Sequence, residues 1–372
     1  MLSFLFYVFI VVVTLQVAYY GLLFSQFSFS IKSKKSNNQP PVSVIITCKN
    51  EAKNLQNNLI NFIEQNYLKF EIILVDDAST DTTFSIIEKH TRHYNFVEGI
   101  QIKATQHYTG NKKNAVTQAI KKAKYEHLLF TDADCIPNSK KWLTNMVSHF
   151  SDTKQLILGY GAYKKENTWI NKLVRYETFL TAWQYFSYSK AGIPYMGVGR
   201  NMGYTKSLFK QIDGFKSHKH LQSGVDDLLV NQVGNKENTA IIWHADSHTV
   251  SQPKTNIKEW IHQKRRHITT ATSYKKRHQF LLGFFYLTQL LFFILSVILL
   301  SLGGKIKWVF LLIGLRYFVY YISLIPAAKK LNEDDLIRWS PFMELFLITL
   351  QMRIFITNLF GKPDKWEPKS NG

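Results

Sequence analysis

Val42-Ser43-Val44-Ile45-Ile46-Thr47, the β-branched run that follows Pro40-Pro41, begins the part of the sequence that decides the fold. The same strand–helix unit returns along the chain, with expected strands at 42–47, 71–75, 97–102 and 127–131 and expected helices at 54–65, 82–90 and 112–124. Nearly continuous apolar strands that alternate with helices are typical of parallel sheets buried on both faces. The sequence therefore predicts an α/β fold with a mostly parallel sheet flanked by helices.

Polar and acidic residues follow three of these strands. The stretches are Thr47-Cys48-Lys49-Asn50-Glu51, Asp76-Asp77-Ala78-Ser79-Thr80-Asp81 and Asp132-Ala133-Asp134. Ligands of such sheets bind at the carboxyl ends of the strands. Acidic groups gathered there repel one another unless a cation or a donor-rich ligand is present. Each group alone is compatible with capping the helix that follows, but three in succession favour a binding crevice.

The triplet Asp132-Ala133-Asp134 has the pattern of a divalent metal site. Two carboxylates separated by one residue can bind one hard cation and leave its other positions open for phosphate oxygens. We therefore expect Asp132 and Asp134 to bind Mg²⁺ or Mn²⁺ beside a phosphate-containing ligand.

Two later stretches also carry charge. Asp226-Asp227 precedes an amphipathic helix, where acidic residues are favourable to the helix dipole in any case. Residues 260–267 are dense in donors suited to a pyrophosphate, and equally suited to anionic lipid beside a membrane. Both stretches come after the three acidic strand ends in the sequence. Taken together in this order, they favour the ligand-binding interpretation.

Long apolar stretches flank this polar segment. Residues 2–24 carry no charge and are long enough to cross a bilayer, without the basic start or small-residue cleavage site of a signal peptide. Residues 279–304 and 308–328, joined by a short turn, predict a transmembrane hairpin. Residues 341–360 contain Glu344, Gln351 and Arg353, so a spanning helix and an interfacial helix are both compatible with that stretch.

The basic residues lie at both edges of the polar segment, at 32–35 and 258–277. By the positive-inside rule, residues 33–278 are expected in the cytoplasm. The chain has 46 Lys and Arg against 26 Asp and Glu, a net charge of +20, which indicates an anionic partner such as lipid, nucleotide phosphate or nucleic acid. No segment resembles a nucleic-acid-binding module. The two cysteines are too few for a disulfide scaffold and fit a reduced compartment.

Taken in order, these motifs resemble the family 2 glycosyltransferases with a GT-A fold, especially the membrane-embedded branch that includes cellulose synthase, hyaluronan synthase and ceramide glucosyltransferase. The matching pieces are residues 42–51 and 75–81, Gly110-Asn111-Lys112-Lys113-Asn114-Ala115, the DxD-like Asp132-Ala133-Asp134, the ED-like Asp226-Asp227 and the QxxRW-like 263–267. The resemblance covers about residues 42–270 and the flanking helices. It departs at Asp226, where the motif has Glu, and at His267, where it has Trp, which puts the acceptor in question more than catalysis.

The resemblance implies a role for each matching residue. Thr47, Glu51 and Asp77 would hold the base and ribose of a nucleotide-sugar, and Lys112 would lie near its phosphates. Asp132 and Asp134 would bind the metal, and Gln263 and Arg266 would contact the pyrophosphate. Asp227 would be the general base of an inverting displacement. Gly197, Gly199, Asp226 and His267 would lie on the acceptor side.

The sequence thus predicts an integral protein of the cytoplasmic (inner) membrane. Its expected parts are an N-terminal transmembrane helix (1–25), a linker (26–41), a cytosolic GT-A domain (42–278), a transmembrane hairpin (279–328) and a juxtamembrane segment (329–372) with the further helix at 341–360. The expected activity is inverting, metal-dependent transfer of a sugar from a nucleotide-sugar to a lipid or lipid-linked acceptor of the cell envelope, without a nucleic acid partner.

Two alternatives accompany this prediction. A processive polysaccharide synthase would need a channel, and the few candidate spans favour a single transfer instead. A non-catalytic membrane protein that binds anionic lipid or nucleic acid would use the +20 charge, but it would leave the carboxylates at 77, 132, 134 and 227 without a role.

Overall fold

The computed structural model describes residues 1–31, 39–106, 108–221, 223–303 and 305–360, without the side chains of His267, Leu359 and Phe360. The description leaves out residues 32–38 of the expected linker, which include the basic residues Lys32, Lys34 and Lys35. It also leaves out residues 361–372.

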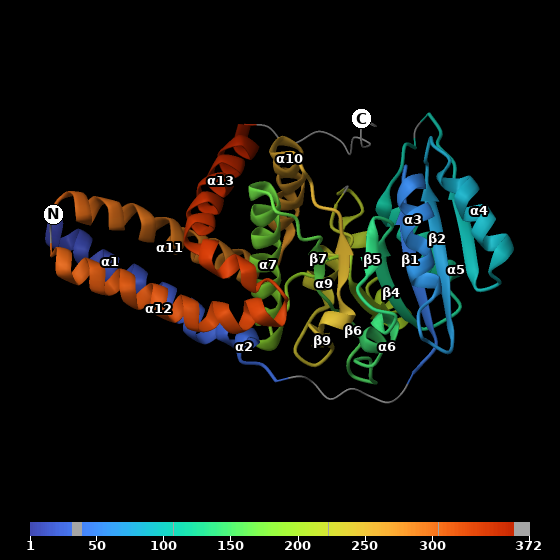
Figure 1. Ribbon diagram of the computed structural model, residues 1–372, viewed down its shortest axis with the longest axis horizontal. Helices are drawn as coiled ribbons and strands as arrows, with labels where there is room; N and C mark the ends of the chain where they lie inside the picture. Colours follow the sequence, from blue (N-terminus) through green and yellow to red (C-terminus); the bar gives the residue numbers. More distant parts are fainter. Residues whose placement is uncertain (32–38, 107, 222, 304, 361–372) are drawn as a thin grey trace.

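A seven-stranded sheet forms the centre of the polar segment (Figure 1). Its order is β3 (Val97–Ile102), β2 (Phe70–Asp77), β1 (Val42–Cys48), β4 (His127–Asp132), β8 (Met202–Thr205), β6 (Leu156–Leu158) and β9 (Thr239–Ile241). The pairs β3–β2, β2–β1, β1–β4 and β6–β9 are parallel, whereas β8 runs antiparallel to both of its neighbours. The predicted α/β fold with a mostly parallel sheet is therefore confirmed.

Helices cover both faces of the sheet because its strands are apolar on both sides. Val44 and Ile46 of β1 point to one face and pack with α3 (Ala52–Ile63), α4 (Thr83–His93) and α6 (Trp142–Val147). Ile45 points to the other face and packs with α5 (Lys112–Lys122), α7 (Trp169–Lys190) and α9 (Asp227–Val233). Each crossover returns the chain to the same sheet edge, so the carboxyl ends of β1, β2 and β4 lie together.

A second, three-stranded sheet has the order β5 (Cys135–Pro137), β10 (Thr249–Ser251) and β7 (Gly161–Tyr163). Asn201 joins this sheet to the large one: its Nδ2 donates to the carbonyls of Tyr160 (2.9 Å) and Ser247 (2.7 Å), and its Oδ1 accepts from Trp142 Nε1 (3.0 Å). The remaining short elements of the domain are α8 (Lys206–Gln211), α10 (Ile257–Ile268) and the 3₁₀ turns Lys216–His218, Ala245–Ser247 and Thr269–Ser273.

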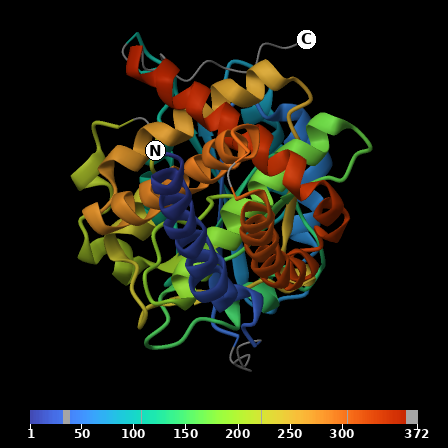
Figure 2. The same cartoon turned by 90° about the vertical axis from the view of Figure 1, so that its left-hand side faces the viewer.

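Four helices in the described residues are long and apolar enough to cross a membrane. The first is Leu2–Ser28, which comprises α1 (Leu2–Ala18), a π-helical turn (Tyr19–Phe24) and α2 (Ser25–Ser28). The second and third are α11 (Lys276–Ser301) and α12 (Ile306–Lys330). The fourth is Asp334–Asn358, which includes the 3₁₀ turn Asp334–Trp339 and most of α13 (Ser340–Phe360). α1, α11 and α12 extend together away from the sheets (Figure 1), whereas α13 runs obliquely across them when the molecule is viewed from that end (Figure 2).

Two of the charges that interrupt the apolar stretches pair with each other inside this bundle. Arg316 of α12 and Glu344 of α13 are 0% and 1% exposed, and their Nη1 and Oε2 atoms lie 2.8 Å apart. The far end of α13 contacts α10 through Arg265 Nε and Asn358 Oδ1, 2.9 Å apart. Pairing removes much of the cost of a charge in the membrane, so Glu344 does not exclude a spanning helix at 341–360.

Candidate active site

The loops after β1 and β2 are held together by hydrogen bonds. Asn50, in the left-handed region at φ 55°, donates its backbone N–H to Ser79 Oγ (2.9 Å) and accepts from the Thr80 N–H through Oδ1 (2.8 Å). Within the second loop, the Ser79 N–H donates to Asp76 Oδ1 (3.2 Å), and burial raises the pKa of the Asp76 carboxyl above its ordinary value. The two strand ends therefore form one edge of a single site.

Glu51 and Asp77, predicted to contact the nucleotide, lie on this edge with their carboxylates already oriented. The Glu51 carboxylate accepts from Asn54 Nδ2, and its backbone N–H donates to Thr83 Oγ1 (2.9 Å). Asp77 is 6% exposed and accepts a hydrogen bond of 2.6 Å from the Tyr108 hydroxyl. Tyr108 is thus a further residue of the site.

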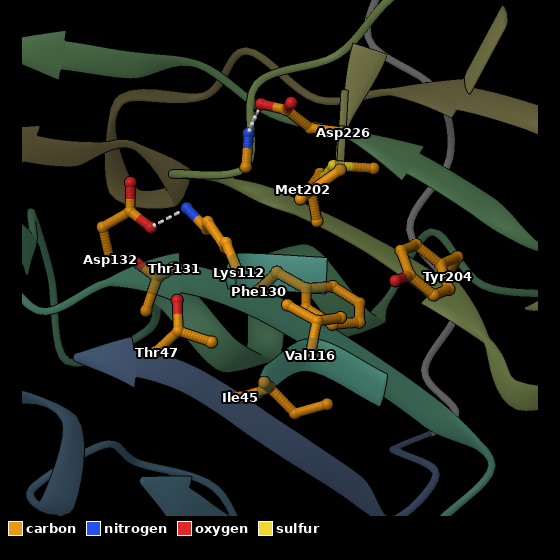
Figure 3. Close-up of a pocket in the computed structure, with 12 residues that line it drawn as sticks. Ile45, Thr47, Lys112, Val116, Phe130, Thr131, Asp132, Met202, Tyr204 and Asp226 are labelled. Atoms are coloured by element: carbon orange, nitrogen blue, oxygen red, sulfur yellow. Dashed lines mark hydrogen bonds and ion pairs between the residues drawn. The ribbon is translucent and has the colours of Figure 1, made fainter. Parts of the chain in front are cut away.

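Lys112 reaches across to the end of β4 from the first turn of α5. The helix begins here because Asn111 caps it, accepting from the N–H groups of Lys113 (3.0 Å) and Asn114 (3.3 Å). Lys112 Nζ lies 2.6 Å from Asp132 Oδ1, and the two side chains are 43% and 29% exposed (Figure 3). This accessible ion pair is suited to rearrange when an anionic ligand or a cation binds.

A cavity of about 20 Å³ lies beside the Lys112–Asp132 pair, enough for about one water molecule. Polar side chains face apolar ones around it, and the lining residues are Ile45, Thr47, Lys112, Val116, Phe130, Thr131, Asp132, Gly199, Met202, Tyr204, Val225 and Asp226 (Figure 3). The hydroxyls of Thr131 and Tyr204 are buried without a hydrogen-bond partner among the described residues. The cavity therefore joins five residues of the predicted site and presents unused hydroxyls to a polar ligand.

Asp226 reaches this cavity from the start of α9 through a contact with the glycine-rich loop 194–201. The Gly199 N–H donates to Asp226 Oδ2 (2.6 Å), and a Cβ at Gly199 would lie 3.2 Å from the same oxygen. Gly197 faces inward instead, since a Cβ there would lie 2.8 Å from Leu158 Cδ2. Glycine at 199 therefore allows the loop backbone to hold the carboxylate directly.

Asp227, predicted to be the general base, lies behind Asp226 and outside the set of described residues that line the cavity. It is 8% exposed, and its Oδ2 accepts from the hydroxyls of Thr270 and Tyr274, the latter at 2.8 Å. Its Oδ1 accepts from the Leu228 N–H (2.8 Å). Burial, with a further contribution from Asp226, raises the pKa of Asp227 to about 6, against the effect of these hydrogen bonds.

Asp132 and Asp134, the expected metal ligands, differ in their surroundings. Asp132 lines the cavity, whereas Asp134 is half-buried beside it, with Cys135 Sγ 3.6 Å from its Oδ1. Among the described side chains there is no group of three or more His, Cys, Asp or Glu that could hold a metal by itself. Two carboxylates suffice for Mg²⁺ or Mn²⁺ when ligand phosphates and water complete the coordination, so the residues fit a metal that is shared with a nucleotide.

Helix α10 carries the predicted pyrophosphate contacts, and none of its described residues lines the cavity. Gln263 Oε1 is buried without a hydrogen-bond partner among the described residues. Burial lowers the pKa of the Arg266 guanidinium below its ordinary value. Lys264 forms an ion pair with Glu177 of α7, so α10 is fixed to the domain. The side chain of His267 lies outside the described part of the chain.

Sequence comparison connects part of the chain to known proteins. Residues 43–213 match the family model described as Glycosyl transferase family 2. A poly-beta-1,6-N-acetyl-D-glucosamine synthase of Staphylococcus epidermidis is 29% identical over 127 residues, 32% of this chain and 30% of that protein. The protein of the same name from Staphylococcus aureus (strain COL) is 30% identical over 95 residues, 26% of this chain and 22% of that protein. The chain thus spans less than a third of the length of these curated relatives.

A solved structure shares the fold over a longer range. A mannosyltransferase from Pyrobaculum calidifontis, in complex with GDP-Man and Mn²⁺, has a TM-score of 0.59 at 19% identity, covering 90% of this chain and 99% of that one. At this identity the likeness concerns the fold alone, and it confirms the expected GT-A architecture. Residues 43–213 therefore match the glycosyltransferase family 2 model, in agreement with the order of the sequence motifs.

Proposed function

We propose that this protein is a membrane-bound glycosyltransferase that moves a sugar from a nucleotide-sugar to a lipid or lipid-linked glycan. The observation that carries the proposal is the cavity at the strand ends, where Thr47, Lys112, Asp132 and Asp226 meet. Transfer from a diphosphate-activated sugar needs positive charge beside the phosphates and a base that takes the proton of the attacking hydroxyl. This cavity offers the Lys112 cation, the carboxylates of Asp132 and Asp226 and the Thr47 hydroxyl.

On the donor side, the base and ribose would be held by Thr47, Glu51 and Asp77. The Lys112 ammonium group would leave its ion pair with Asp132 and pair with a phosphate oxygen of the donor. Asp132 and Asp134 would bind Mg²⁺ or Mn²⁺, which when bound supplies positive charge to the leaving diphosphate. Gln263 and Arg266 of α10 would contact the same diphosphate. The buried Gln263 Oε1 without a partner among the described residues supports a polar ligand near this helix.

The chemical step would be one direct displacement. A carboxylate removes the proton from the acceptor hydroxyl, the hydroxyl oxygen bonds to the anomeric carbon, and the bond from that carbon to the diphosphate oxygen breaks, inverting the centre. We propose Asp226 for the carboxylate because it lines the cavity. The sequence-based assignment to Asp227 stays a prediction, and a pKa of about 6 is compatible with a base at neutral pH.

The acceptor would come from the membrane beside the domain. Gly199 and Asp226 line the cavity, and Gly197 shapes the loop that leads to it. The basic residues around 258–277 support a cytoplasmic location for the domain. Single cysteines introduced into the domain should be protected from an impermeant thiol reagent in intact cells. Native Cys48 and Cys135 are buried and would first be replaced; rapid labelling of the introduced cysteines would contradict this topology.

The activity can be tested with the detergent-purified chain and a panel of nucleotide-sugars. Release of nucleoside diphosphate is expected with Mn²⁺ and a lipid extract, and not with EDTA. Asp226→Asn should reduce the rate by about 10² to 10⁴-fold, whereas Asp213→Asn, a matched control at an exposed carboxylate, should not. Binding to anionic vesicles without nucleotide release from any donor would contradict the proposal and favour a non-catalytic lipid-binding protein.

The two staphylococcal relatives, both named poly-beta-1,6-N-acetyl-D-glucosamine synthases, favour a second candidate. A polymerising enzyme of that kind would use a nucleotide-activated N-acetylglucosamine as donor and release products of many lengths. A single transfer would give one product, one sugar longer than the acceptor. Mass spectrometry of the products separates the two candidates.

A further inference from the structure

Helix α9, whose N-cap residue Asp226 lies on the cavity wall, is bonded to the segment that leads into the predicted membrane hairpin. We call residues 269–278 the membrane-entry segment; it comprises the 3₁₀ turn Thr269–Ser273 and continues into the first turn of α11. The segment connects α10 to the first helix of the predicted hairpin. Most of its contacts with α9 involve side chains that are buried.

The first contact is made by Asp227. Its Oδ2 accepts from the hydroxyl of Thr270, which is 2% exposed, and from that of Tyr274, which is 8% exposed. Hydrogen bonds to a charged, buried acceptor are the stronger kind, and loss of a donor leaves part of the carboxylate unsatisfied. Asp227 therefore holds the two hydroxyls of the membrane-entry segment against the first turn of α9.

The second contact lies one helical turn further along. Asn231, 3% exposed, accepts from the Lys275 N–H through Oδ1 (2.8 Å), while its Nδ2 lies 2.9 Å from His278 Nδ1. Lys275 Nζ also donates to the Gln232 carbonyl (3.1 Å). Two successive turns of α9 are thus bonded to the membrane-entry segment, so the helix and the segment move together.

We propose that Asp227 is a positioning residue that couples the membrane helix α11 to the active site. Its neighbour Asp226 receives the Gly199 N–H on one side, and the Asp227 contacts fix the backbone on the other. A shift of α11 would be transmitted through Tyr274 and Thr270 to the carboxylate on the cavity wall. This proposal rests on the proposed function in one respect: it takes Asp226 as the carboxylate that acts on the acceptor.

The test uses the full chain in detergent or nanodiscs. Thr270→Val combined with Tyr274→Phe removes both hydroxyls and keeps the side-chain volumes. Thr272→Val is the matched control, since Thr272 is exposed and donates only to the Thr269 carbonyl within the segment. Thr270→Ser restores a hydroxyl, and Tyr274→Phe alone is a milder variant in case the double variant does not fold.

Two readouts separate coupling from general damage. Hydrogen exchange of the amides at 228–233 should be faster in the double variant than in the parent and the Thr272→Val control. The kcat should fall by about 10 to 100-fold with the KM for nucleotide-sugar nearly unchanged, because about 1 Å of misplacement of a reacting group costs about 100-fold. Thr270→Ser with wild-type Tyr274 should recover most of the rate.

Unchanged exchange at 228–233, or a double variant with the kcat of the parent, would overturn the proposal. A proportional loss of donor binding and kcat would also overturn it, because that result indicates a role in donor binding. If the parent releases no nucleoside diphosphate from any donor, the proposed function fails on its own, and the exchange measurement still decides whether the coupling exists.

Discussion

Removal of the Glu344 carboxylate should destabilise the helical bundle more than any other single truncation within it. Glu344 accepts from Arg316 Nη1 (2.8 Å), from Gln289 Nε2 (2.7 Å) and from the Tyr20 hydroxyl (3.2 Å). One carboxylate therefore joins the π-helical turn after α1, and helices α11 and α12, to α13. In Glu344→Ala, all three donors lose their acceptor at once.

The magnitude follows from the position of Arg316. Its guanidinium is 0% exposed and lies about 5 Å from the ring centroids of Tyr20 (5.0 Å) and Phe292 (4.8 Å), which attract the cation without neutralising it. A buried charge whose partner is removed typically costs about 3–5 kcal/mol. Replacement of both partners, in Arg316→Met with Glu344→Leu, leaves no buried charge and should cost about 1 kcal/mol or less.

The assay is a double-mutant cycle of the free energy of unfolding in mixed micelles, with loss of helical circular dichroism as the signal. A coupling free energy of about 3 kcal/mol or more is expected between the two positions. Arg353→Met, which removes an exposed charge from the same helix α13, is the control and should be nearly neutral. Additive effects of the two substitutions would refute the reasoning, because they would show that the pair is solvated in the membrane-embedded protein.

Three further substitutions test the active site. Asp134→Asn should weaken Mn²⁺-dependent binding of the nucleotide-sugar in a calorimetric titration, and an unchanged metal titration would show that Asp134 is not a ligand. Gly199→Ala places a Cβ 3.2 Å from Asp226 Oδ2 and should lower kcat by about 10-fold or more with donor binding retained; a kcat equal to that of the parent would show that the loop accommodates the methyl group. Asp227→Asn should alter the pH dependence of stability. Since the pKa of Asp227 is raised from 3.8 to about 6 in the folded chain, its contribution is present below about pH 4 and is lost as the pH rises to 6. The parent should therefore lose about 3 kcal/mol relative to the variant over that interval, and parallel pH profiles of unfolding would contradict the raised pKa.

The parallel half of the sheet was predictable because each of its strands carries a local signal. Val42–Thr47 and His127–Thr131 are apolar runs of five or six residues next to helical stretches, and they appear as β1 and β4. The strands β6 and β9 have only three residues each, and their partners are about 80 residues apart in sequence. Such pairings depend on the assembled core rather than on local propensity, so no local pattern predicted them.

The site was predictable up to the orientation of individual side chains. Strand ends meet at one edge of a parallel sheet, and this rule correctly brought Thr47 and Asp132 together. Which of Asp226 and Asp227 faces the cavity depends on the turn at the start of α9. Consecutive side chains of a helix point about 100° apart, so only one of the two can face it. The sequence could not supply the register of that turn. Tyr108 was missed for a similar reason: its hydroxyl reaches Asp77 through a loop with no motif of its own.

The packing of the bundle also bears on the choice between a single transfer and polymer synthesis. A growing polysaccharide that crossed the membrane through this chain would need a path lined by polar groups and water. Between α1, α11 and α12, however, apolar side chains fill the interior, with Phe9, Leu299 and Val309 each fully buried. The polar side chains deeper in the bundle are already joined to one another around Arg316 and Glu344. The described helices thus favour an acceptor that approaches along the membrane surface, beside the oblique α13. If the products prove to be polymers, their path across the membrane must involve groups outside these described helices, and crosslinking of the active protein to its product would locate them.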